Sequence, residues 1–246
     1  MTIPAEGASA RIERHEGWGE LILSRPERRN ALVGPMVSEL RAGLADLLSG
    51  GARAIVLRGD GGCFCSGLDV EAFAADPAPA WRAEWAETWI GFHRALYDCP
   101  AVIIGALERF AINGGSSPAL ACDLLVAGEG AYLLVGEAAI GMHAPMNIAW
   151  LRLRATEAIA AQLLLAAERV PAAELLRLGL AYRVVADSAV VETAQAMAAK
   201  LAGYRGDALA AIKRSLRRAP PAGADMFAAV QATGFQSAPP ARVGGG

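Results

Sequence analysis

The chain has 246 residues, a formal net charge of −2 and 54% apolar residues. This length can bury one substantial core, so we expect one main domain. The sequence pI of about 6.0 comes without a basic stripe, which argues against a nucleic-acid-binding protein. No apolar run reaches the length of a membrane span, and the N-terminus lacks the basic and apolar regions of a signal peptide. We therefore expect no membrane association and a cytoplasmic location.

The cysteines give no sign of a metal centre. Cys63 and Cys65 form a C-x-C pair, whereas Cys99 and Cys122 stand apart and the three histidines are scattered along the chain. This arrangement lacks the ligand spacing of a zinc site. We expect no bound metal and four reduced thiols in a cytosolic protein.

Strands are expected to alternate with helices over the first 135 residues. The segment 11–24 alternates polar and apolar residues around Gly17, which predicts two strands joined by a turn. The helix that follows has apolar residues three or four positions apart, from Met36 to Leu47. In chain order we expect strands at 11–14 and 18–24, a helix at 35–48, a strand at 54–57, a helix at 81–98, and strands at 101–107, 124–127 and 131–135.

Helices dominate the rest of the chain. We expect helices at 148–166, 171–178, 188–203 and 206–217, a short strand at 182–185, a further segment at 222–235 and a mobile Pro/Gly-rich tail at 237–246. The first two of these helices are separated by Val170-Pro171. Crossover connections of this kind favour parallel strands covered by helices, an α/β fold.

The stretch from Arg109 to Asp123 lies at the centre of this pattern. Gly114 and Gly115 are followed by a predicted helix start, with Ser116 or Ser117 as the N-cap and Pro118 in the first turn. Glycine permits close approach of the backbone to a ligand, and the first amides of a helix lack internal partners. Such a turn can hold negative charge on an oxygen. The alternative is a turn that needs small residues only for packing.

Three segments together resemble the enoyl-CoA hydratase/isomerase family of the crotonase superfamily. They are Phe64–Val70 and Asn113–Asp123, similar to the two oxyanion loops of the family, and Val135–Gly141, similar to its catalytic carboxylate loop. Arg25-Pro26 and Asn30-Ala31-Leu32 match the early segment of the family. The resemblance covers roughly residues 10 to 217. Neither a G-x-G-x-x-G fingerprint nor a G-x-x-x-x-G-K loop is present to support a nucleotide-binding protein.

The resemblance implies a spiral of ββα units in a core at 1–185, followed by a C-terminal helical region and tail at 186–246. It further implies a homotrimer or a hexamer, and an acyl-CoA thioester as the substrate. Coenzyme A would then be part of the substrate, with no additional cofactor.

By the same resemblance, Leu68 N–H and Gly114 N–H bind the thioester oxygen. Charge builds on that oxygen in an enolate, and fixed donors in a dry site stabilise it. Glu137 aligns with a glutamate that moves protons at the acyl chain. Partial burial would raise its pKa toward the working pH and suit it to this role, although a loop glutamate is by default a solvated surface charge.

Further residues are candidates for binding the substrate or its coenzyme A part. Arg28, Arg29 and Lys213 could meet phosphates, although surface charge is the default role for each. The other candidates are Ala31, Ser66, Gly67, Asp69, Ser117 and His143. Asp69 can instead brace its turn, and His143 could tune Glu137 or act as a second acid or base.

The sequence departs from the family at two positions. Hydratases of the family carry a second glutamate where this chain has Ser117, and a hydroxyl alone is a poor general base near neutral pH. We therefore expect double-bond isomerisation by one carboxylate. The alternatives are a hydratase whose water is held by Ser117 or His143, a non-catalytic acyl-CoA-binding subunit, and a serine hydrolase, which no G-x-S-x-G motif supports. Asn113 replaces a glycine common in the family, which leaves the shape of the second oxyanion turn open.

Overall fold

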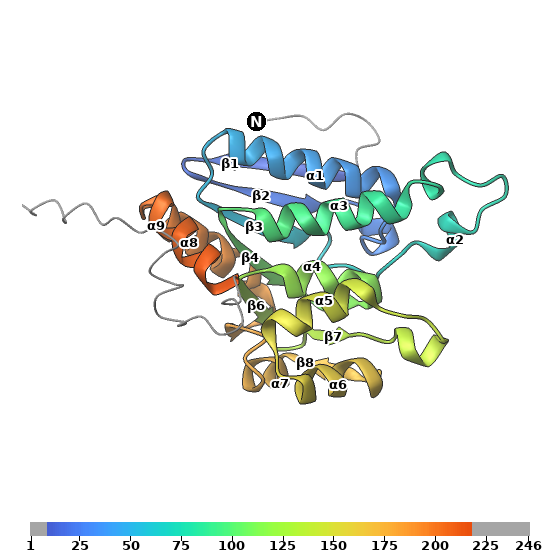
Figure 1. Cartoon of the computed structure of the whole chain (residues 1–246). Coiled ribbons are helices and arrows are strands. Elements are labelled where there is room, and N and C mark those ends of the chain that lie inside the picture. Colours follow the sequence, from blue (N-terminus) through green and yellow to red (C-terminus); the bar gives the residue numbers. More distant parts are fainter. Residues whose placement is uncertain (1–8, 218–246) are drawn as a thin grey trace, which may run out of the picture.

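The computed structural model describes residues 9–217, which are arranged around a six-stranded sheet (Figure 1). The strand order is β1-β2-β3-β4-β6-β9. The first pair, β1 and β2, is antiparallel, and the other neighbouring pairs are parallel. The strands are β1 (Ala10–His15), β2 (Trp18–Leu23), β3 (Ala54–Gly59), β4 (Val102–Leu107), β6 (Leu124–Gly128) and β9 (Arg183–Val185).

A second, three-stranded sheet lies below the first in Figure 1. It contains β5 (Phe110–Ile112), β7 (Tyr132–Leu134) and β8 (Arg169–Pro171). The predicted break between helices at Val170-Pro171 is confirmed, but the sequence does not predict that these residues form a strand. Val170 pairs with Leu133 in an antiparallel register, and the proline occupies the end of an edge strand, where its missing N–H is tolerated.

Nine α-helices are present in residues 9–217. They are α1 (Gly34–Ser49), α2 (Val70–Phe73), α3 (Trp85–Asp98), α4 (Ser116–Ala121), α5 (Pro145–Arg154), α6 (Glu157–Leu165), α7 (Ala172–Arg177), α8 (Val190–Ala202) and α9 (Gly206–Arg217). None of these helices has the length and apolar character needed to cross a bilayer. The single helix expected at 148–166 is divided, because Thr156 begins α6 as its N-cap and accepts a hydrogen bond from Ile159 N at 3.4 Å.

Both faces of the main sheet are covered. Ile55 and Leu57 of β3 pack in the core beneath α1 and α3, whereas Ala54 and Val56 point to the opposite face, against α8. Strands buried on both sides read as continuous apolar runs, which explains why these strands were visible in the sequence. Helix α8, in the expected C-terminal helical region, therefore packs directly on the sheet. The segment 222–235 and the tail 237–246 lie outside the described residues.

Candidate active site

The first loop of the site, residues 64–68, is held on both sides by backbone hydrogen bonds. Ile112 N donates to Cys65 O at 3.0 Å, which joins the loop to β5. On the other side, Leu32 N donates to Gly67 O at 2.8 Å, and Asp69 N donates to Leu32 O at 3.0 Å. These two hydrogen bonds form a parallel β-bridge between Leu32 and Leu68, in which the N–H of Leu68 points away from Leu32. Within residues 9–217, the Leu68 N–H donates no hydrogen bond.

The second loop meets the first at Gly114. A β-carbon placed on Gly114 would lie 4.0 Å from Leu68 N, and one placed on Gly67 would lie 3.8 Å from Gly114 N. Gly67 has a φ of +94°, and a β-carbon there would also lie 2.9 Å from Ile112 O, so the contact between the loops requires glycine. The residues predicted to hold the thioester oxygen are thus brought together by two loops far apart in sequence.

The shape of the second turn depends on Asn113. Its φ of +51° lies in the left-handed region, which asparagine tolerates better than most residues. Its Oδ1 accepts a hydrogen bond from Gly136 N at 2.9 Å. Asparagine is therefore compatible with this left-handed turn, and its side chain ties the turn to the loop of Glu137.

The predicted N-cap at Ser116 or Ser117 is wrong. Helix α4 has Gly115 at its N-cap, without a side-chain capping bond. The Ser116 hydroxyl contacts Ala111 O and Leu134 O, both at 2.9 Å. The short 3-10 turn η3 (Asn113–Gly115) runs directly into α4, so the chain is already helical where the cap was expected. Pro118 does lie in the first turn, as predicted.

Glu137 lies in the 3-10 turn η4 (Glu137–Ile140) and is 7% exposed. Its Oε1 accepts a hydrogen bond from Asn147 Nδ2 at 3.1 Å, whereas its Oε2 is buried without a hydrogen-bond partner. Burial raises the pKa of Glu137, and hydrogen bonds from its own backbone and from Asn147 oppose the increase. A buried carboxyl with a raised pKa and one free oxygen is suited to proton transfer near neutral pH.

Ser117, at the position where the resemblance implies a glutamate in hydratases, belongs to a directed series of hydrogen bonds. Trp150 Nε1 can only donate, so its 2.9 Å bond makes His93 Nδ1 an acceptor. His93 Nε2–H then donates to Ser117 Oγ at 3.1 Å, and Ser117 donates to Gly114 O at 2.8 Å. Burial lowers the pKa of His93 to about 3, so the ring is neutral at physiological pH. Within residues 9–217, no carboxylate takes part in this series of hydrogen bonds from Trp150 to Gly114 O.

The candidates for coenzyme A binding lie in different surroundings. Asp69 is 4% exposed, caps α2 through Ala72 N at 3.1 Å, and accepts hydrogen bonds from Arg25 and Arg28, each at 3.1 Å. Arg28 also reaches Glu71. Ala31 is buried, Ser66 is half-buried against Arg28 O, and Arg29 is exposed. The backbone of Arg29 is joined to the first loop, because Ser66 N donates to Arg29 O at 3.1 Å.

Two other candidates are placed away from Glu137. His143 is exposed and lines an apolar cavity of about 640 Å³ between η4, α5 and α6, and Glu137 is not among the residues that line it. Lys213 is buried, bonded to Ala101 O at 2.6 Å and paired with Asp123 at 2.7 Å. Because its ammonium group is buried and already paired, Lys213 is not available to bind a phosphate of coenzyme A.

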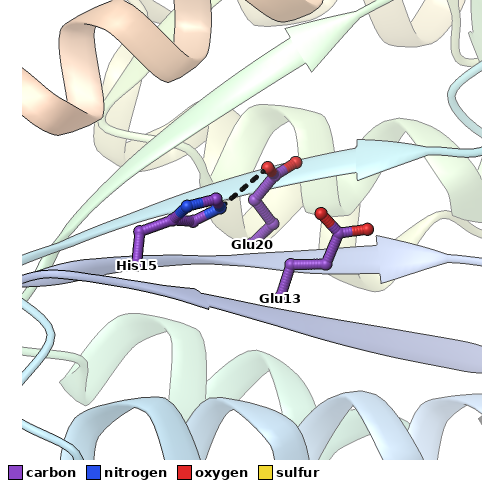
Figure 2. Close-up of side chains that lie close together, drawn as sticks. All are labelled: Glu13, His15 and Glu20. Atoms are coloured by element: carbon purple, nitrogen blue, oxygen red, sulfur yellow. Dashed lines mark hydrogen bonds and ion pairs between the residues drawn. The ribbon is translucent and has the colours of Figure 1, made fainter. Parts of the chain in front are cut away.

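A cluster of Glu13, His15 and Glu20 has the spacing of a metal site within residues 9–217, and Figure 2 shows the three side chains side by side on β1 and β2. The cluster is already neutralised by other groups. Glu20 is fully buried and accepts bonds from Arg58 Nε at 2.6 Å, Gln195 Nε2 at 2.7 Å and His15 Nε2 at 3.3 Å. This set forms an ion-pair network beneath α8, and nothing about it calls for a metal.

Comparisons with known proteins identify the family of the chain. The model of the family described as Enoyl-CoA hydratase/isomerase matches residues 13–236. This chain belongs to that family. A "Probable enoyl-CoA hydratase" of Rhodobacter capsulatus is 34% identical over 206 residues, which are 83% of this chain and 79% of that protein.

Solved structures of the family share the fold. An enoyl-CoA hydratase from Polaromonas sp. has a TM-score of 0.80 at 27% identity and covers 91% of this chain and 88% of its own. A putative enoyl-CoA hydratase from Thermobifida fusca, solved in complex with CoA, has a TM-score of 0.79 at 29% identity, over 92% of this chain and 91% of its own. The family and the crotonase-like α/β fold that the motifs predict are confirmed.

Sequence reasoning missed Asn147 and the contribution of His93 to the site. The sequence assigns His93 no role in the site, and Asn147 lies outside all the matching motifs. Both are buried polar residues on helices, where their partners come from other elements. One sequence signal was available: each is a polar residue on the apolar side of a helix. His93 follows the buried Phe92, and Asn147 lies one turn before the buried Trp150.

Proposed function

We propose that this protein acts on an enoyl-CoA thioester through an enolate whose oxygen is held by Leu68 N–H and Gly114 N–H. The observation that carries the proposal is Glu137: a buried carboxyl with a raised pKa and a free Oε2, tied through Asn113 to the turn that bears Gly114. Fixed amides offset the charge that develops on the thioester oxygen, and Glu137 exchanges a proton with the acyl chain.

For the net reaction, the names of the relatives favour hydration over the isomerisation expected from Ser117. Several relatives carry the name enoyl-CoA hydratase, and one from Proteus mirabilis, 32% identical over 63% of this chain, is a carnitinyl-CoA dehydratase. In hydration, Glu137 removes a proton from water as its oxygen attacks the β-carbon. The enolate then takes the proton back from Glu137 at the α-carbon, so one water adds across the double bond.

Isomerisation is the second candidate, and Ser117 favours it. The Ser117 hydroxyl is fully buried and engaged by His93 and Gly114 O, so it cannot replace the missing carboxylate as a base. One carboxylate suffices to remove a proton from the α-carbon of a 3-enoyl-CoA, which gives a dienolate, and to return that proton at the γ-carbon, which yields the 2-enoyl-CoA; the reverse reaction uses the same two steps. This path moves a double bond and incorporates no water.

One experiment separates the two reactions. The enzyme is incubated with panels of 2-enoyl-CoA and 3-enoyl-CoA thioesters of graded chain length in water enriched in a heavy oxygen isotope, and products are analysed by mass spectrometry. Heavy oxygen in a 3-hydroxyacyl-CoA product supports hydration, and a shifted double bond without heavy oxygen supports isomerisation. Tight binding of acyl-CoA with neither product, and without solvent deuterium exchange at the α-carbon, would indicate the non-catalytic subunit.

We also propose that the protein assembles as a homotrimer or hexamer. Large apolar side chains on α6 and α9 are exposed in the single chain, among them Leu165 at 76%, Ile212 at 59% and Leu216 at 82%. Apolar surface of this kind is typical of protein contacts. Light scattering coupled to size-exclusion chromatography would give the mass of the assembly, and a monomer at micromolar concentration would contradict the proposal.

A further inference from the structure

Asn147, in the first turn of α5, connects the two halves of the candidate site. Its side chain is 2% exposed, and its Nδ2 donates two hydrogen bonds: to Asn113 O at 3.0 Å and to Glu137 Oε1 at 3.1 Å. Both partners are acceptors that cannot donate when Glu137 is ionised. The amide orientation is therefore fixed, because a flipped side chain would place Oδ1 against both of them.

The bond to Asn113 O acts on an oxyanion donor. The carbonyl of Asn113 and the N–H of Gly114 belong to the same peptide unit. A hydrogen bond accepted by the carbonyl polarises that unit and makes its N–H a stronger donor. It also fixes the plane of the peptide, and with it the direction of the Gly114 N–H.

The bond to Glu137 acts on the proton carrier. It stabilises the charged carboxylate and so opposes the effect of burial on the pKa of Glu137. Because Oε1 is held by Asn147, Oε2 is the oxygen left to exchange a proton. Asn147 Oδ1 is itself buried without a partner in the described structure, a cost to stability that packing alone would not require.

We propose that Asn147 is a positioning residue that holds the Gly114 amide and the Glu137 carboxylate in one fixed geometry and selects Oε2 as the proton-carrying oxygen. This inference rests on the proposed function, because it assigns the site the same oxyanion and the same carboxylate. It adds that a single amide side chain couples the two.

The test compares Asn147→Ala and Asn147→Asp with the wild type. Asn147→Asp keeps the shape of the side chain but, when ionised, loses both donors. Ala149→Ser, an exposed position on the same helix, is the matched control. We expect kcat of both Asn147 variants to fall about tenfold or more, less than the roughly hundredfold loss typical of removing an oxyanion donor itself. Ala149→Ser should keep wild-type kcat.

Two further readouts separate positioning from a purely structural effect. The acid limb of kcat/KM reports the pKa of the catalytic base in the free enzyme. It should move to higher pH in Asn147→Ala, because a bond that favours the charged carboxylate is lost. In a Glu137→Gln background, where turnover is blocked, infrared spectra of a bound enoyl-CoA should show a less polarised thioester carbonyl when Asn147→Ala is added.

The outcomes are distinct. Wild-type kcat, an unmoved acid limb and an unchanged carbonyl band in Asn147→Ala would overturn the inference and leave the proposed function intact. A wild-type enzyme that neither binds nor converts any enoyl-CoA would overturn the proposed function, and the inference with it. If Asn147→Ala fails to fold by circular dichroism, the isosteric Asn147→Asp decides: wild-type kcat and acid limb in that variant overturn the inference.

Discussion

Replacing Glu137 by glutamine tests the proton carrier with the smallest change of shape. The glutamine oxygen can still accept the bond from Asn147 that Glu137 Oε1 accepts at 3.1 Å. The amide nitrogen then occupies the place of the unpartnered Oε2 and can neither take up nor return a proton. Because positioned acids and bases contribute about 100- to 10,000-fold, kcat should fall by a factor in that range. KM should change little, since the two amides proposed to bind the thioester oxygen are untouched.

The same substitution should not destabilise the fold. Burial raises the pKa of Glu137, so the folded state binds its proton more tightly than the unfolded state does. The carboxyl therefore contributes most to stability below its unfolded pKa of about 4.3, and this contribution declines as the pH rises to the folded value. Glutamine does not titrate. The difference in unfolding free energy, variant minus wild type, should accordingly increase with pH across that window.

The assay is steady-state turnover of an enoyl-CoA, paired with urea unfolding at a series of pH values. Ala139→Ser, at an exposed position of the same turn, is the control and should behave as wild type in both measurements. The reasoning is refuted if Glu137→Gln keeps full turnover. It is also refuted if loss of activity coincides with a large loss of stability at neutral pH, because Glu137 would then be a structural residue.

Three further substitutions have defined outcomes. Asp69→Asn weakens the bonds from Arg25 and Arg28 and should cost roughly 1–2 kcal/mol in urea unfolding at pH 7. Burial alone would raise the pKa of Asp69, but these bonds outweigh it and lower the pKa, so the cost should shrink as the pH falls through that pKa. Lys213→Met should lower unfolding free energy by about 2 kcal/mol and leave the affinity for coenzyme A, measured by calorimetry, unchanged. His93→Phe should cost about 1–3 kcal/mol in thermal unfolding without moving the pH profile of turnover, because a ring with a pKa of about 3 is neutral throughout.

The fold could be predicted from sequence wherever burial leaves a regular pattern. The continuous apolar strands β3, β4 and β6 and the spaced apolar residues of α1 were visible because both faces of the sheet are covered. The three-residue strands β5 and β8 were not, although β7 and β9 of the same length were: β5 falls within the stretch interpreted as a turn, and the exposed edge strand β8 falls at the break between two helices. Their pairing depends on β7, which the chain reaches only after the turn that bears Gly114.

The site was predictable only as far as its motifs extend. Leu68, Gly114 and Glu137 lie in segments with a recognisable order, and the structure places the loops of the first two in contact. Hydrogen-bond partners from other elements could not be found in this way. Asn147 and His93 reach the site from α5 and α3, and only the packing of α4 against both helices brings them there.

The ion pairs of Asp123 have a consequence for the order in which the protein matures. Asp123 is the last residue of the stretch from Arg109 to Asp123 that contains Gly114. It is paired with Lys213 at 2.7 Å and Arg217 at 2.8 Å, both on α9. During synthesis on the ribosome, these two cations emerge after the sheet, both loops and Glu137. Nascent chains stalled before residue 213 would contain the sheet, both loops and Glu137 while Asp123 still lacked these two counter-ions, so the ion pairs that hold α9 to the start of β6 should form late in translation.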